Sequence, residues 1–217
     1  MKPISEVYNC DCLKYLRLCK DNYFDLAICD PPYGLPADST NGRGKLKSRI
    51  LNAGNIKEWD IKPDKEYFDE LFRVSKNQII WGGNYFDLPP TRCVCVWDKM
   101  KPWENLSQVE IAWTSFDLPA KLFRYDNRSW TKHHPTGKPV ELYSWLLNNF
   151  AKAGDKILDT HLGGGTSRVA AYMMDFDFYG CEINKEYFDA AEEYFKRKCL
   201  VEYTLRDGRK AKQLELF

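Results

Sequence analysis

The sequence predicts an α/β protein with a largely parallel sheet between helices. Short apolar runs rich in β-branched and aromatic residues recur along the chain, and amphipathic helical patterns separate most of them. This alternation is typical of a sheet that helices cover on both faces. Strands are expected at 6–9, 24–29, 77–81, 92–97, 109–114, 156–158 and 177–181, and helices at 12–19, 64–74, 139–151, 167–174 and 185–198.

Two of these runs, 92–97 and 109–114, follow one another without a helix between them. They predict a hairpin that adds an antiparallel strand at one edge of the sheet. A chain of 217 residues fits one domain better than two. Within this single domain, 1–217, the segment at about 34–62 is rich in Gly, Asn, Ser, Lys and Arg and lacks periodicity, so we expect a mobile loop there.

The composition narrows the class of protein. With 44% hydrophobic and 29% charged residues, the chain is typical of a globular protein. No apolar run approaches the roughly 20 residues that cross a bilayer, and no apolar signal segment follows Met1. We therefore expect a cytoplasmic protein with no membrane partner.

Positive charge is concentrated locally, although the net charge is only +1. A second, sparser basic run spans 121–132. A solvated loop explains either run about as well as contact with nucleic-acid phosphates does. The first run places four cations within seven residues: Arg43, Lys45, Lys47 and Arg49.

The eight cysteines form no C-x-x-C pair. Cys93 and Cys95 alternate within a predicted strand, which puts both on one face. We expect reduced core thiols rather than disulfides. Because His133 and His134 lack partners at ligand spacing, we expect no metal site.

The sharpest motif is Asp30-Pro31-Pro32-Tyr33, directly after the apolar strand 24–29. Open α/β sheets bind ligands at the carboxyl ends of their strands. The prolines stiffen the backbone and remove two N–H donors, which leaves carbonyls that only accept. Asp30 and the Pro31 carbonyl are therefore suited to accept both N–H bonds of an exocyclic amino group, while Tyr33 is suited to stack on the base.

A second motif, residues 157–167, is read as a strand, a glycine loop and the start of a helix. Gly163 and Gly165 let a ligand approach the backbone, and the helix N-terminus favours a carboxylate. Arg168 stands where a dinucleotide fingerprint needs its third glycine, so a nucleoside with an amino-acid tail fits better than a pyrophosphate. Glu182 ends the next strand at about the 20-residue spacing of an acid that binds ribose hydroxyls.

A third run, 134–142, leads into a predicted helix. Pro139 suits the first position of this helix. The helix has one apolar face, which is consistent with packing on the sheet. From the residues alone, Lys138 receives no role.

Together these segments resemble the amino-group DNA methyltransferases of the β class, whose catalytic motif precedes the cofactor motif. Residues 30–33 match their motif IV, 134–142 resemble motif X, 159–166 resemble motif I, and Glu182 matches the acid of motif II. Residues 9–13 resemble the family's N-terminal segment, whose Asp contacts the cofactor adenine; that role passes to Asp11. His161 stands in place of the family's aromatic residue, where it is still able to cover the cofactor.

The resemblance implies a Rossmann-like, S-adenosylmethionine-dependent methyltransferase fold in circularly permuted motif order. It implies a site-specific enzyme that methylates N6 of an adenine flipped out of double-stranded DNA, with S-adenosylmethionine as cofactor and no metal. The expected catalytic residues are Asp30, Pro31, Pro32 and Tyr33; the expected cofactor-binding residues are Asp11, Lys138, Asp159, His161, Gly163, Gly165, Thr166 and Glu182; Arg43, Lys45, Lys47 and Arg49 are expected to contact DNA.

Three alternatives stay open. Cytosine N4 methylation uses the same motif. An RNA or protein-glutamine methyltransferase is the second alternative, since an amide nitrogen presents a similar pair of donors. A non-catalytic DNA-binding relative is disfavoured because Asp30 and Tyr33 are intact. The short chain resembles methyltransferases of phages or mobile elements, fits a restriction-modification context and leaves a homodimer open.

Overall fold

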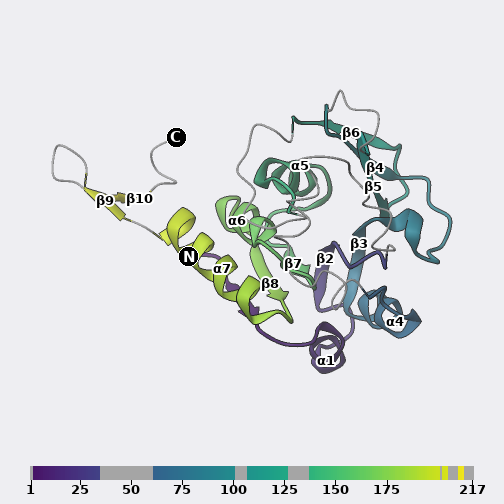
Figure 1. The fold of residues 1–217 in the computed structure, drawn as a ribbon, viewed down its shortest axis with the longest axis horizontal. Coiled ribbons are helices and arrows are strands. Elements are labelled where there is room, and N and C mark those ends of the chain that lie inside the picture. Colours follow the sequence, from purple (N-terminus) through teal and green to yellow (C-terminus); the bar gives the residue numbers. More distant parts are fainter. Residues whose placement is uncertain are drawn as a thin grey trace, which may run out of the picture.

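The computed structural model describes residues 2–34, 61–100, 107–126, 137–200, 202–204 and 210–212. The expected DNA-contacting cations at 43–49, and nearly all of the loop expected at 34–62, lie outside the described residues. An eight-stranded sheet with the order β1-β8-β7-β2-β3-β5-β4-β6 forms the centre of the molecule (Figure 1). Its strands are β1 (Ser5–Tyr8), β2 (Phe24–Cys29), β3 (Ser75–Trp81), β4 (Val94–Asp98), β5 (Val109–Thr114), β6 (Lys121–Arg124), β7 (Lys156–Asp159) and β8 (Asp177–Cys181).

Helices cover both faces of this sheet. The described helices are α1 (Cys12–Leu18), α4 (Lys65–Val74), α5 (Val140–Phe150), α6 (Thr166–Met173) and α7 (Lys185–Phe195), with a short η2 turn (Gly83–Tyr85) and a π-helical turn η3 (Lys196–Leu200) that continues α7. A two-stranded antiparallel ribbon of β9 (Glu202–Thr204) and β10 (Lys210–Lys212) follows. Within the described ranges, no helix combines the length and apolar composition that crossing a bilayer requires.

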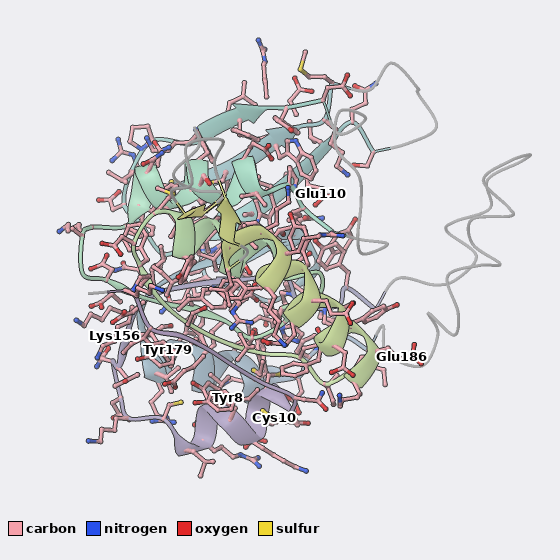
Figure 2. The ribbon with its side chains drawn as sticks, turned by 90° about the vertical axis from the view of Figure 1, so that its left-hand side faces the viewer. Tyr8, Cys10, Glu110, Lys156, Tyr179 and Glu186 are labelled. Atoms are coloured by element: carbon pink, nitrogen blue, oxygen red, sulfur yellow. The ribbon has the colours of Figure 1, made fainter. Side chains whose placement is uncertain are left out.

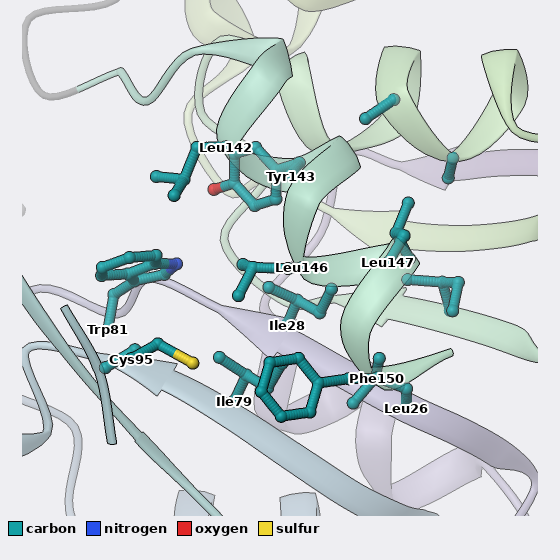
Figure 3. Packing of buried hydrophobic residues seen from close by; sticks show 14 of the residues in the cluster. Leu26, Ile28, Ile79, Trp81, Cys95, Leu142, Tyr143, Leu146, Leu147 and Phe150 are labelled. Atoms are coloured by element: carbon teal, nitrogen blue, oxygen red, sulfur yellow. The ribbon is translucent and has the colours of Figure 1, made fainter. Parts of the chain in front are cut away.

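Strand β2 shows why its sequence is apolar throughout. Leu26 and Ile28 pack under α5 on one face, while Ala27 and Cys29 pack with α1 and α4 on the other. Figure 3 shows the α5 side, where the leucines of the helix lie over Leu26 and Ile28. A strand buried on both faces reads as a continuous hydrophobic run rather than an alternating one.

The fold class that the sequence predicts is confirmed, with one correction to the sheet. Strand β5 pairs antiparallel with both β3 and β4, so the predicted β4–β5 hairpin is present. The antiparallel strand is not at the edge, however, because β4 lies beyond β5 and β6 adds to β4 in parallel. Strand β6 was not predicted: its four residues alternate between half-buried and exposed and had been read only as part of a basic run.

Candidate active site

Two predicted motifs meet because their strands are neighbours. Strand β2 pairs in parallel with both β7 and β3, so all three end at the same edge of the sheet. Asp30 follows β2 directly, and Asp159 is the last residue of β7. The Asp-Pro-Pro-Tyr motif and the glycine loop are far apart in sequence, but they leave the sheet side by side at the edge where such sheets bind ligands.

Both oxygens of the Asp30 carboxylate have partners. The Tyr33 hydroxyl donates to Oδ1 over 2.7 Å, and the Lys138 ammonium donates to Oδ2. Lys138 lies two residues before α5, which brings it to this strand end, and its side chain is only 3% exposed. The carboxylate is thus held from two sides, and one of its holders is the aromatic residue of its own motif.

The Tyr33 ring belongs to a small aromatic wall. It stacks on Tyr85, with ring centroids 5.0 Å apart and an angle of 19° between the planes, and it meets the edge of Phe86. Its other neighbour is the backbone of Gly82, whose φ of 66° places it in the left-handed region. The Tyr33 hydroxyl, at one end of this aromatic wall, therefore lies within hydrogen-bond distance of Asp30.

Lys138 contacts a second carboxylate, Glu110 of β5, at 3.1 Å. Burial alone would lower the pKa of Lys138, but Asp30 and Glu110 outweigh burial and raise it. The resemblance implies that Lys138 is a cofactor-binding residue. In the structure its ammonium group is paired with these two carboxylates. Sequence reasoning missed Glu110 altogether.

The glycine loop is tied to the end of β7 by Asp159. This buried carboxylate accepts the His161 N–H at 3.0 Å and the Ser167 hydroxyl at 2.6 Å. Burial raises the pKa of Asp159 to about 7. Gly165 has a φ of 75°, and a Cβ there would lie 3.0 Å from that of Ala191, so the loop turns into α6 where a larger residue would crowd α7.

Glu182 closes the loop from β8. Its carboxylate accepts the Gly163 N–H at 2.9 Å and the Asn184 N–H at 2.8 Å. The Asn9 amide donates to the Glu182 backbone carbonyl at 2.8 Å, and Asp11 begins α1 by accepting the Lys14 N–H. The N-terminal segment and Glu182, the predicted ribose-binding acid, therefore lie together at the β1 side of the sheet. Figure 2 labels Tyr8 and Cys10 of this segment, and it labels Glu110 at the β5 side.

His161 lies at the mouth of the same loop. Its Nδ1 is 2.9 Å from the Thr160 hydroxyl, its Nε2 is 3.8 Å from the Cys12 sulfur, and its ring meets the edge of Tyr67. Burial lowers the pKa of His161 to about 4, so the ring is neutral at physiological pH. Thr166, the first residue of α6, is buried. Among the described residues, its side chain makes no hydrogen bond to the carboxylate of Asp159 or of Glu182.

Comparisons with known proteins agree with this arrangement. A family model described as DNA methylase, of the N6/N4 type, matches residues 78–193, more than half of the chain. The type II methyltransferase M2.DpnII of Streptococcus pneumoniae is 33% identical over 145 residues, which cover 67% of this chain and 50% of that protein. The chain belongs to the N6/N4-type DNA methylases.

Other relatives of this DNA methylase extend over more of its length. The type II methyltransferase M2.MboI of Moraxella bovis is 23% identical over 87% of this chain and 86% of its own. The solved complex of M1.HpyAVI with SAM is 17% identical and aligns with a TM-score of 0.56 over 87% of this chain and 97% of that one. The PvuII DNA methyltransferase, named as cytosine-N4-specific, is 13% identical with a TM-score of 0.61 over 94% and 90%. At these identities the solved structures support the fold alone.

The contact between Gly82 and Tyr33 gives a first prediction for this DNA methylase. A Cβ at position 82 would lie 2.2 Å from Cε1 of the Tyr33 ring, so Gly82→Ala must displace that ring. We expect methyl transfer to fall by about 10-fold or more, because small misplacements at a reacting centre are costly. The measurement is a rate of methyl incorporation into DNA.

Gly154→Ala is the matched control. Gly154 has a φ of 88°, but a Cβ there would meet no described atom within 4 Å. Both substitutions carry the backbone cost of about 1–2 kcal/mol for a left-handed residue. Only Gly82→Ala should lose activity, and equal activities in the two variants would contradict the contact's importance.

Proposed function

We propose that this chain transfers a methyl group from S-adenosylmethionine to N6 of an adenine in double-stranded DNA. The observation that carries the proposal is the Asp30 carboxylate, held by Lys138 at the edge of the sheet beside an aromatic wall and next to the glycine loop. A flipped base stacks on Tyr33, and its amino group takes the place of the Tyr33 hydroxyl as donor to Oδ1. The Pro31 carbonyl accepts the second N–H.

Residues at the ends of β7 and β8 fit the methyl donor. Glu182 accepts the ribose hydroxyls, Asp11 contacts the adenine ring, and Asp159 faces the amino-acid end. Gly163, Gly165 and Thr166 let the ligand approach the backbone, and the neutral His161 ring covers it. The fit rests on the acid at each strand end and on the loop that both acids hold. When bound, S-adenosylmethionine supplies a methyl group activated by a positively charged sulfur.

The protein's part in the reaction is mainly positioning and electrostatics. The amino nitrogen forms its new bond to carbon as the carbon–sulfur bond breaks, and it is positively charged until a proton leaves. The Asp30 carboxylate faces this charge and stabilises it. Because the proton leaves after transfer, Asp30 need not be a strong base. Lys138 keeps the Asp30 carboxylate directed at the amino group.

Adenine is favoured over cytosine by the size of the aromatic wall. Tyr33 and Tyr85 are stacked and partly exposed, and the area of these rings suits a purine. Cytosine N4 is the second candidate, since one solved structure with this fold is named as specific for it. The cations at 43–49 belong to the same proposal: in a single catalytic domain, they contact DNA phosphates, which adds affinity without sequence choice.

One assay separates the candidate activities. The purified protein is incubated with radiolabelled S-adenosylmethionine and, in parallel, duplex DNA, RNA and protein. We expect label in DNA only. Label in RNA or protein would overturn the proposal in favour of those substrates, and no label from a cooperatively melting protein would favour a non-catalytic relative.

The buried Asp159 predicts how cofactor binding depends on pH. Its pKa of about 7 lies above the usual value of about 3.9, so the folded protein keeps a proton that the unfolded chain releases. This group therefore costs stability as pH rises towards 7, and the cost is complete above that pH. A positively charged donor favours the ionised form, so affinity for S-adenosylmethionine should rise about three- to tenfold from about pH 6 to about pH 8.

Calorimetry in two buffers of different ionisation enthalpy measures this effect as proton release on binding. Release should be largest near pH 6 and small near pH 8. Asp159→Asn removes the titrating group and should flatten the dependence. Equal proton release by Asp159→Asn and the unaltered protein would assign the titration to another group.

A further inference from the structure

Two lysines and two carboxylates alternate in a chain of contacts that ends at Asp30. Lys99 lies 2.5 Å from Oε1 of Glu110, Lys138 lies 3.1 Å from Oε2 of Glu110, and Lys138 also pairs with Oδ2 of Asp30. The side chains of Lys99, Glu110, Lys138 and Asp30 are only 10%, 26%, 3% and 17% exposed. Each oxygen of Glu110 thus serves one lysine, and the four charges balance.

The direction of β5 brings Glu110 to this place. Because β5 runs antiparallel to β3 and β4, its first residues lie at the edge where the parallel strands end. Glu110 pairs in register with Trp97, and Lys99 follows the end of β4, with its N–H donating to the Gln108 carbonyl at 2.9 Å. Glu110 therefore reaches the rear of the Asp30 site from a strand that carries none of the recognised motifs.

Glu110 offsets part of the electrostatic cost of burying the Lys138 ammonium group. It also sets the direction in which the Lys138 side chain points. A buried ammonium group requires paired charges and satisfied N–H donors. Lys138 has one carboxylate on either side, and its nitrogen lies 5.1 Å from the centroid of the Trp81 ring. Burial alone would raise the pKa of Glu110, but Lys138 and Lys99 outweigh burial and lower it to about 2, so Glu110 is ionised throughout the physiological range.

We propose that Glu110, anchored by Lys99, is a positioning residue for methyl transfer. It fixes the direction of Lys138, and Lys138 in turn fixes the plane of the Asp30 carboxylate that receives the amino group. The inference rests on the proposed function of Asp30 and extends it to two side chains that touch neither the base nor the cofactor. Glu110 therefore affects the transfer step, not the binding of S-adenosylmethionine.

Glu110→Gln tests the inference under single-turnover conditions, with excess enzyme, saturating S-adenosylmethionine and genomic DNA from a methylation-free host. We expect the transfer rate to fall about 10- to 100-fold, because small misplacements of reacting groups slow a reaction by this much. The dissociation constant of S-adenosylmethionine, measured by calorimetry, should change by less than about twofold. Glu66→Gln, which breaks the exposed pair between Arg17 of α1 and Glu66 of α4, is the matched control and should keep the full rate.

The double variant Lys99→Met with Glu110→Gln distinguishes the positioning of Lys138 by Glu110 from the effect of Glu110 on the net charge of the cluster. It removes one charge of each sign, so it should recover thermal stability relative to Glu110→Gln while the transfer rate stays low. Recovery of the rate would overturn the inference, because net charge alone would then suffice. Loss of cooperative melting in both variants would also overturn it, since Glu110 would then serve folding.

Failure of this inference is distinguishable from failure of the proposed function. If the unaltered protein does not label DNA, the proposed function fails. If the unaltered protein is active and Glu110→Gln is equally active, only the positioning role of Glu110 fails. A parallel loss of rate and of S-adenosylmethionine affinity would contradict a role confined to the transfer step.

Discussion

Asp30→Asn should lower the rate of methyl transfer by about 10²- to 10³-fold, the effect of losing one preorganised electrostatic contact at a reacting centre. The amide keeps the shape of the side chain but loses the negative charge that faces the amino nitrogen. It also leaves Lys138 with Glu110 as its only anionic partner among the described residues. Affinity for S-adenosylmethionine should stay within about twofold, because Glu182, Asp159 and the glycine loop are untouched.

Asp25→Asn is a close control for this substitution. Asp25 lies on β2, at the end away from Asp30. It pairs with Lys76 at 2.6 Å and accepts the Lys156 N–H at 2.9 Å. The Asp25→Asn variant should lose some stability and keep its methyltransferase activity. Near-normal turnover in Asp30→Asn, or equal losses in the two variants, would remove Asp30 from the reaction.

Lys138→Met should both destabilise the protein and slow methyl transfer. The substitution leaves the carboxylates of Asp30 and Glu110 close together without the cation between them. Breaking a buried pair in this way costs about 3–5 kcal/mol. Denaturant unfolding measures the loss. Lys76→Met, which removes the exposed lysine of a pair with the partly buried Asp25, should cost no more than about 1 kcal/mol.

The pH dependence of this variant has a definite sign. Without Lys138 one carboxylate is favoured in its protonated form, so the folded state binds more protons than the unfolded chain. The destabilisation of Lys138→Met should therefore shrink as pH falls from about 7 towards 5. A loss below about 1 kcal/mol would contradict the contribution of the buried pairs. A fall in S-adenosylmethionine affinity at an unchanged transfer rate would support the cofactor-binding role that the sequence resemblance implies.

The helices and most strands were predictable because their patterns reflect burial and capping directly. Strand β2 is apolar throughout since helices cover both of its faces. Helix α4 begins where the Asp64 side chain accepts the Tyr67 N–H, and α7 begins where Asn184 accepts two N–H groups. These signals are local, so they can be read from a single sequence.

The rear of the site was not predictable, because nothing local marks it. Glu110 sits on a strand whose alternation suits an ordinary solvent-facing carboxylate, and only the antiparallel direction of β5 carries it to Asp30. Lys138 was noticed through its motif, but its partners are not local. Asp30 lies 108 residues away in sequence, and Glu110 lies on β5. Long-range pairing of charges depends on strand order, which periodicity does not encode.

The most direct measurement of the central claim is nucleoside mass spectrometry of DNA from a methylation-free host that expresses this protein. We expect N6-methyladenine at a recurrent sequence, and its absence when Asp30→Asn is expressed at the same level. N4-methylcytosine in its place would contradict the choice of base while leaving the site intact. Unmodified DNA from cells that hold the folded protein and S-adenosylmethionine would contradict the account as a whole.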